Sequence, residues 1–294
     1  MSRLDLLKSA GVTTEQYPFT PKVFATPHGE VSYLDEGTGP VVVMAHGTPS
    51  WSWDWTHAVK TLRATHRVIA ADMLGFGLSD RPAPTAFPYT LEAHTGVLRD
   101  LLRHLNVDRF ALVVHDFGGP VALPLAVEAP HRVTSITVMN SWAWPLSVNP
   151  DFARQRWMIR SPLMPWAYRA FNMSPRVMVK ASWGRRAPLD KTLHQSFMGM
   201  FPTREDREGT VGFLLATTEE DARMNDLSKG MVKLRDHRAG IVWGMADTFI
   251  PPLHMERFKA LWPRALVEPI PGAGHFLTHE APEAVTAFIQ RVVA

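Results

Sequence analysis

The chain has 294 residues, of which 46% are hydrophobic and 20% are charged. This composition is typical of a globular protein with a large buried core, and it excludes a disordered chain. The net charge is +3 with the two signs mostly interspersed, so we expect no nucleic acid partner. The absence of cysteine excludes disulfides, thiolate nucleophiles and cysteine-ligated metals.

The N-terminal segment MSRLDLLKSAGVTTEQYPF lacks the long apolar stretch of a signal peptide. No apolar run approaches the ~18 residues that a membrane span needs. We therefore expect a cytoplasmic protein without a membrane span. The sequence leaves its oligomeric state open.

Five apolar segments recur along the chain and predict buried strands. They are Val41–Gly47, Arg67–Asp72, Phe110–Asp116, Ser135–Asn140 and Gly240–Asp247. Continuous apolar runs are typical of parallel strands that are covered on both faces. Between the second and third segments, leucines recur on one face of a predicted helix, at Leu91, Leu98, Leu101, Leu102 and Leu105. This alternation predicts an α/β fold with a mostly parallel, doubly wound sheet.

The alternation stops after Asn140 and resumes at Ala239. The intervening sequence is rich in Trp, Met, Pro and Arg and has no strand pattern. We therefore predict that residues 141–238 form a helical cap domain inserted after a central strand. Residues 1–140 and 239–294 would together form the core domain, and a ligand is expected between the cap and the carboxyl edge of the sheet.

Two features of the cap composition bear on its ligands. A set of methionines predicts a soft apolar surface and hence a small apolar substrate: Met158, Met164, Met173, Met178, Met198 and Met200. From Arg154 to Lys191 there are nine basic residues and one acidic residue, Asp190. We expect this basic run to face water. The alternative is that it attracts anions or anionic surfaces.

The segment Val114-His115-Asp116-Phe117-Gly118 has the pattern of a strand, a sharp turn and a helix. Gly118 and Gly119 leave room for the strand and helix to approach closely. Hydrolases with this turn usually carry Gly-x-Ser-x-Gly, in which the serine is the nucleophile. Because Asp116 occupies the serine position, the sequence predicts Asp116 as the nucleophile.

Two later segments supply the acid and the base that such a nucleophile needs. WGMADTFIPP ends an apolar strand at Asp247, and PGAGHFLTHEAP places His275 in a glycine-flanked loop after another strand pattern. The order nucleophile, acid, base is the one expected for this turn. The segment AHGTP follows the strand from Val41, and it predicts an oxyanion hole formed by the backbone N–H groups of Thr48 and Phe117.

Over nearly its whole length the chain resembles α/β-hydrolases of the haloalkane dehalogenase type, which are related to epoxide hydrolases. The matching segments are YLDEGTGP, HGTPSWSW, DMLGFGLSDRP, VVHDFGGP, WGMAD and GAGHF. The segment MNSWAWP is similar to the branch in which Asn140 stands where another branch has Glu, which leaves Asp247 as the catalytic acid. The resemblance implies a hydrolase that needs no cofactor or metal.

A carboxylate nucleophile indicates which bond is attacked. Attack of Asp116 on an ester carbonyl would give a reactive anhydride, whereas displacement at an sp3 carbon gives an ordinary ester. His275, oriented by Asp247, would then activate a water molecule that hydrolyses this ester. We therefore expect a haloalkane dehalogenase-like hydrolase acting on apolar organohalides.

Two positions depart from the family pattern. Resembling dehalogenases place Trp directly after the nucleophile and mostly Asn after His-Gly, and both side chains donate N–H to the departing halide. Here these positions hold Phe117, which has no donor, and Thr48, which has a shorter hydroxyl. The candidate substitute contacts are Trp142, which is favoured because it follows the strand end, and Trp51, Trp144 and Tyr168.

These departures keep two alternatives open. One is an epoxide hydrolase or another hydrolase with an aspartate nucleophile. Resembling epoxide hydrolases usually use two cap tyrosines as acids, whereas the predicted cap holds only Tyr168. The other alternative is a ligand-binding or near-inactive member of the family.

Overall fold

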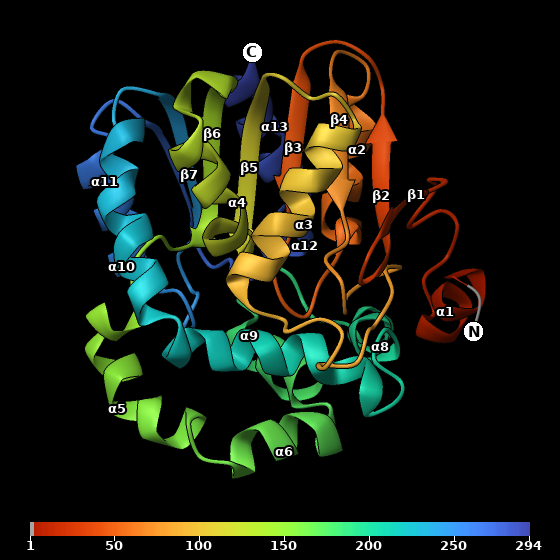
Figure 1. Cartoon of the computed structure of the whole chain (residues 1–294). Helices are drawn as coiled ribbons and strands as arrows, with labels where there is room; N and C mark the ends of the chain where they lie inside the picture. The colour runs from red at the N-terminus through yellow and green to blue at the C-terminus, as the bar shows by residue number, and fades with distance from the viewer. Residues whose placement is uncertain (1–2) are drawn as a thin grey trace.

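An eight-stranded sheet forms the centre of the computed structural model, which describes residues 3–294 (Figure 1). Its strand order is β1-β2-β4-β3-β5-β6-β7-β8. β2 is antiparallel to both of its neighbours, β1 and β4. The remaining neighbours in the order β4-β3-β5-β6-β7-β8 are parallel to one another. The predicted mostly parallel sheet is therefore confirmed. The strands are β1 (Lys22–Thr26), β2 (Gly29–Glu36), β3 (Val41–Ala45), β4 (Arg67–Ala71), β5 (Phe110–Asp116), β6 (Val133–Ser141), β7 (Arg238–Gly244) and β8 (Leu266–Ile270).

The five predicted strands are β3 to β7, with differences at their ends. β5 has the predicted bounds. β7 ends at Gly244 rather than Asp247, because the chain turns there and brings Asp247 above the sheet edge. The sequence pattern predicts neither β1 nor β2. β1 is a largely exposed edge strand and has no continuous apolar run.

Helices cover both faces of the sheet. α3 (Leu91–His104) and α4 (Gly118–Glu128) lie in front of it in Figure 1, and α13 (Pro282–Val293) lies behind it, packed on α2 (Thr56–Leu62). The predicted leucine stripe of α3 is buried from Leu91 to Leu102. The remaining helices of the core are α1 (Arg3–Ala10), α11 (Pro252–Leu261) and α12 (Leu277–Glu280).

Between β6 and β7, residues 142–237 hold helices joined by loops, whereas Ser141 and Arg238, the predicted limits of the cap, belong to β6 and β7. Figure 1 shows these helices below the carboxyl ends of the parallel strands, while α10 (Asp221–Gly230) packs on α4. We call five of them the cap helices: α5 (Pro150–Ile159), α6 (Leu163–Phe171), α7 (Val179–Ser182), α8 (Lys191–Gly199) and α9 (Glu208–Glu219). Among the helices of residues 3–294, none is both long and apolar enough to span a bilayer.

Candidate active site

Asp116 is the last residue of β5 and has a left-handed backbone, with φ of 51°. The turn into α4 is possible because its neighbours are glycines. A Cβ at Gly118 would lie 2.0 Å from the carbonyl oxygen of Ala45, and a Cβ at Gly47 would lie 2.1 Å from Asp116 Oδ1. The tight approach of three segments thus lifts the Asp116 side chain above the sheet edge.

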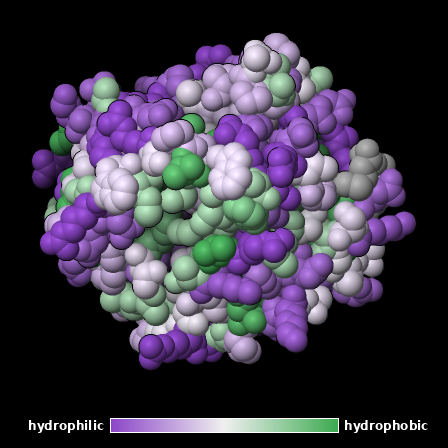
Figure 2. All heavy atoms as spheres, turned by 90° about the horizontal axis from the view of Figure 1, so that it is seen from below, coloured by the Kyte–Doolittle hydropathy of each residue, from purple (hydrophilic) through white to green (hydrophobic). Residues whose placement is uncertain are grey.

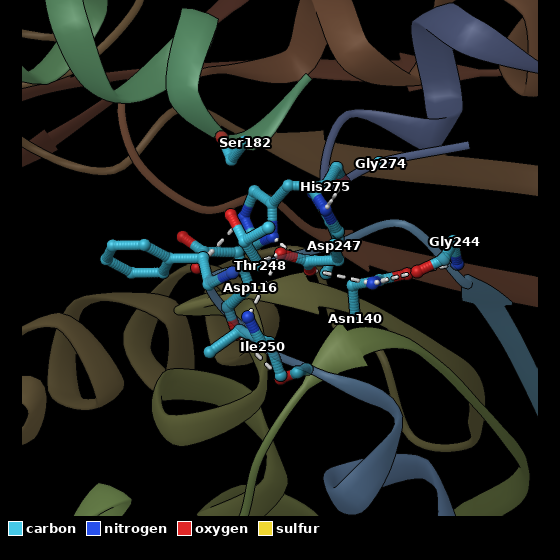
Figure 3. Close-up of polar contacts among 12 residues, drawn as sticks. Asp116, Asn140, Ser182, Gly244, Asp247, Thr248, Ile250, Gly274 and His275 are labelled. Carbon is cyan, nitrogen blue, oxygen red and sulfur yellow. Dashed lines mark hydrogen bonds and ion pairs between the residues drawn. The ribbon is translucent and has the colours of Figure 1, made fainter. Parts of the chain in front are cut away.

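The structure brings Asp116, Asp247 and His275 together, although they come from the end of β5 and from two separate loops (Figure 3). His275 Nε2 is 3.2 Å from Asp116 Oδ2, and His275 Nδ1 donates to Asp247 Oδ2 over 2.7 Å. All three side chains are buried. The imidazole therefore bridges two buried carboxylates.

The Asp247 carboxylate is fixed by four donors. Besides His275, the Asn140 side-chain amide donates to Oδ2 over 2.7 Å, and the N–H groups of Phe249 and Ile250 donate to Oδ1 over 2.7 and 3.0 Å. Asn140 Oδ1 in turn accepts the N–H of Gly244 over 2.7 Å. Sequence reasoning used Asn140 only as a sign that a Glu was absent. The available sequence signal was its place at the end of a predicted strand, and the structure adds a left-handed φ of 33°.

The two carboxylates determine the charge of His275. Burial alone would lower the pKa of this imidazole, but the negative charges of Asp247 and Asp116 outweigh burial and raise the pKa to about 10. His275 is therefore protonated at neutral pH as long as both carboxylates are ionised.

A second set of residues fixes the loop that carries His275. Glu280 accepts the N–H of Gly274 over 2.9 Å and that of Gly184, beside α7, over 3.0 Å. Burial raises the pKa of Glu280 to about 7 despite these two bonds, which favour its ionised form. His115 Nε2 donates to the carbonyl oxygen of His275 over 2.9 Å. No local sequence pattern indicates Glu280 or this role of His115.

Thr48 lies on the other side of Asp116. Its backbone N–H donates to Asp116 Oδ1 over 2.8 Å, as expected for one member of an oxyanion hole. Its hydroxyl is buried, has no hydrogen-bond partner among the described residues, and belongs to a residue that lines the adjoining cavity. Phe117 directly precedes α4 and also lines this cavity.

A cavity of about 360 Å³ connects these residues to the cap helices. Its floor is formed by Asp116, His275 and their neighbours, and much of its wall by apolar side chains of the cap. Four of the six predicted methionines line it, namely Met158, Met164, Met173 and Met178. None of the nine residues of the basic run lines it. Seven of the nine face water as expected, whereas Arg156 and Arg169 are partly buried in ion pairs with Asp221 and Glu208.

Three of the four candidate substitute contacts do not reach this cavity. Trp142, which directly follows β6, is buried and packs edge-to-face with Phe117 at 4.8 Å between ring centroids. Trp144 donates its indole N–H to His254, and Trp51 packs on Tyr17. The expectation that these indoles contact the substrate is therefore not met.

Tyr168 is the candidate contact that does line the cavity. Its side chain is buried, and burial raises the pKa of its hydroxyl, so it is a neutral donor at ordinary pH. Among the described residues, no group of three or more His, Asp or Glu side chains has the arrangement of a metal site.

Comparison with known proteins agrees with this architecture. The family described as "alpha/beta hydrolase fold" matches residues 40–282, and the chain belongs to this family. It is 31% identical over 277 residues to haloalkane dehalogenase 2 of Mycobacterium tuberculosis, a match that covers 93% of this chain and 94% of the relative. The chain is therefore a haloalkane dehalogenase-like hydrolase.

Two further matches bear on the breadth of this group. The chain is 32% identical over 302 residues to a cis-3-alkyl-4-alkyloxetan-2-one decarboxylase of Xanthomonas campestris pv. campestris, which covers 95% of this chain and 99% of the relative. In structure it is similar to haloalkane dehalogenase DbeA from Bradyrhizobium elkani, with a TM-score of 0.82 at 20% identity over 93% of this chain and 98% of the other. The latter likeness establishes the fold.

Proposed function

We propose that this chain hydrolyses small apolar organohalides through a covalent ester on Asp116, with residues 141–238 as the cap that selects the substrate. The observation that carries the proposal is the Asp116 carboxylate, held between the Thr48 N–H at 2.8 Å and His275 Nε2 at 3.2 Å. Asp116 is the nucleophile, His275 the base and Asp247 the acid that orients it. The cysteine-free composition favours a cytoplasmic location.

In the first step, Asp116 Oδ2 attacks an sp3 carbon while Oδ1 stays with the Thr48 N–H. The carbon–halogen bond breaks as the carbon–oxygen bond forms, and the halide leaves with the electron pair. Esterification removes the charge of one of the two carboxylates that raise the pKa of His275. The pKa of His275 therefore falls, and its proton is released with the halide.

In the second step, neutral His275 accepts a proton from water, and the water oxygen attacks the Asp116 carbonyl carbon. The oxyanion that develops on Oδ1 accepts the N–H of Thr48, and we assign the N–H of Phe117 as the second donor. Collapse expels the alcohol, which takes the proton from His275. The Asp116 acid then returns a proton to His275 and restores the resting pair.

The leaving group is served by fewer donors than in the resembling dehalogenases. Phe117 offers none, so we assign the role to the buried Thr48 hydroxyl, which has no other partner among the described residues. A single neutral hydroxyl stabilises a halide weakly. Iodides and bromides, which need less stabilisation than chlorides, are therefore the preferred substrates.

A second candidate reaction is the opening of a strained ring. The Phe117 side chain provides no donor for a departing halide ion, whereas ring opening releases no free anion. Attack of Asp116 on the sp3 ring carbon bonded to the ring oxygen of an oxetan-2-one would break that carbon–oxygen bond and give an alkyl ester and a carboxylate on the same molecule. Loss of CO2 with expulsion of Asp116 would then give an alkene. The Xanthomonas relative bears the name of such a decarboxylase. An epoxide would instead need an acid for its alkoxide, for which Tyr168 is the group at hand.

The covalent step is tested with His275→Phe. This variant keeps the nucleophile but lacks the base, so incubation with an alkyl bromide should increase the intact mass by one alkyl group. Peptide mapping should place that group on Asp116, and the matched variant His275→Phe with Asp116→Asn should stay unmodified. An unmodified His275→Phe protein, with a bromide that the wild type turns over, would overturn the proposed mechanism.

A further inference from the structure

The outer surface of the cap carries an unusual number of exposed apolar side chains. Nine large apolar residues are exposed in the described chain, and six of them lie between Trp157 and Val177. We call these six the cap patch: Trp157 (76% exposed), Leu163 (71%), Trp166 (55%), Phe171 (55%), Val177 (42%) and Met158 (38%). Figure 2 looks onto this side of the molecule and shows apolar side chains gathered around a hollow.

Helix α6 explains why the patch is apolar. Its sequence, LMPWAYRAF, places Met164 and Tyr168 toward the cavity and Leu163 and Trp166 toward water. A surface helix ordinarily has a polar outer face. The one charged residue of α6, Arg169, is bound to Glu208 of α9. Both faces of α6 are therefore apolar, and only the inner one is covered.

The segment that carries the patch also holds three exposed basic residues whose charges are unpaired. Arg160 lies between α5 and α6, and Arg176 and Lys180 flank Val177; all three are exposed. Their side chains form no ion pair among the described residues. A partner of this surface should therefore be negatively charged as well as apolar.

The patch also adjoins the mouth of the active-site cavity. Met158 belongs to both, and the exposed residues Asp151 and Gln155 of α5 line the cavity beside it. A ligand that enters along this wall passes the exposed face of α5. An apolar compound held at the patch would therefore be close to the cavity.

We propose that the cap patch docks the protein peripherally on an anionic lipid surface. Trp side chains are favoured at membrane–water interfaces, where the apolar ring is buried and the N–H stays hydrated. The flanking arginines and lysine would lie over the anionic headgroups. Two copies of this chain are a poorer fit, because a symmetric contact would place these unpaired positive charges near one another. This surface is separate from the proposed reaction, which requires no lipid.

The test is flotation of the full-length protein with phosphatidylcholine vesicles and with mixed phosphatidylcholine–phosphatidylglycerol vesicles. The wild type should bind the mixed vesicles and bind phosphatidylcholine weakly. Replacing Arg160, Arg176 and Lys180 by Gln should weaken binding to the mixed vesicles by about fivefold per residue, or roughly a hundredfold together. Trp157→Gln with Trp166→Gln should weaken it by at least about tenfold, and added salt should weaken the wild type.

Matched controls use exposed residues outside the five cap helices α5 to α9. Val232→Gln with Leu253→Gln removes comparable apolar groups, with exposures of 57% and 43%. Arg109, Lys233 and Arg235 are exposed, form no ion pair and precede β5 or β7, so their replacement by Gln removes the same charge from the opposite end of the strands. These controls should bind like the wild type.

Two results would overturn the proposal. One is a failure of the flotation pattern, in which the wild type does not bind mixed vesicles or the cap variants and control variants lose binding equally. The other is a wild type that sediments as a dimer and becomes a monomer in the tryptophan variant without vesicle binding, which would make the patch a contact between copies. Both readouts need no substrate, so they are independent of the catalytic proposal.

Discussion

Restoring the two missing halide donors is the perturbation that tests the proposed chemistry most directly. The changes are Thr48→Asn and Phe117→Trp. Thr48 is already hydrogen-bonded to Asp116 through its N–H at 2.8 Å, so an amide on this residue starts beside the reacting carbon. Removal of one transition-state donor from an enzyme site typically costs about 10²–10³ in rate. Gain of both should therefore raise kcat/KM on an alkyl bromide by at least about a hundredfold.

The structure sets one condition on this experiment. The Phe117 ring is stacked on Phe213 of α9, with 4.3 Å between centroids and 2° between planes, and Phe213 is itself fully buried. A larger indole at 117 would overpack this stack at a typical cost of about 1–3 kcal/mol. The changes should therefore be made together with Phe213→Leu, and the reference protein is Phe213→Leu alone.

The assay is halide release from a chloride, a bromide and an iodide of one alkyl chain, with an epoxide and an oxetan-2-one measured beside them. The wild type should prefer iodide over bromide over chloride, and the gain in the variant should be largest for chloride. Both donors contact one leaving atom, so their effects should be non-additive. The reasoning is refuted by a wild type that already turns over chloride as fast as bromide. No gain on halides, with loss on the oxetanone, would favour ring opening as the natural reaction.

Two further predictions concern the base and its support. Asn140→Asp tolerates the left-handed backbone and keeps the acceptor for the Gly244 N–H, but it replaces the donor to Asp247 by a second carboxylate. Both kcat and thermal stability should therefore fall. Unchanged kinetics would contradict the assigned role of Asn140. The pKa of His275 is raised from about 6.5 to about 10 by folding, so the folded state holds more protons between these values and the stability from this group is lost as pH rises from 6.5 to 10. Denaturant unfolding should show a decline of a few kcal/mol, to order of magnitude, over this range, and His275→Gln should flatten it; parallel curves would refute the coupling.

The meeting of Asp116, Asp247 and His275 at one site was predictable from local sequence. The pattern around Asp116 encodes its own turn, because the adjoining glycines permit the close approach of strand and helix. Asp247 and His275 each follow an apolar strand in the expected chain order, and parallel strands bring such residues to one edge of a sheet. Features that depend on local sequence pattern and on the order of residues along the chain could therefore be predicted.

Contacts between distant segments could only be decided by the folded structure. Asn140 binds Asp247 across 107 positions of sequence, and Glu280 joins the His275 loop to Gly184 across 96. Trp142 follows the end of β6, so its sequence position predicted a contact with the substrate. In the structure its indole instead packs on the Phe117 ring. In the same way, α6 has an apolar composition suited to burial. Its outer face is nevertheless exposed, because no segment of residues 3–294 packs on it. Sequence determines which side chains are available and their spacing along the chain, whereas packing among remote elements determines which of them share a cavity, a hydrogen bond or the solvent.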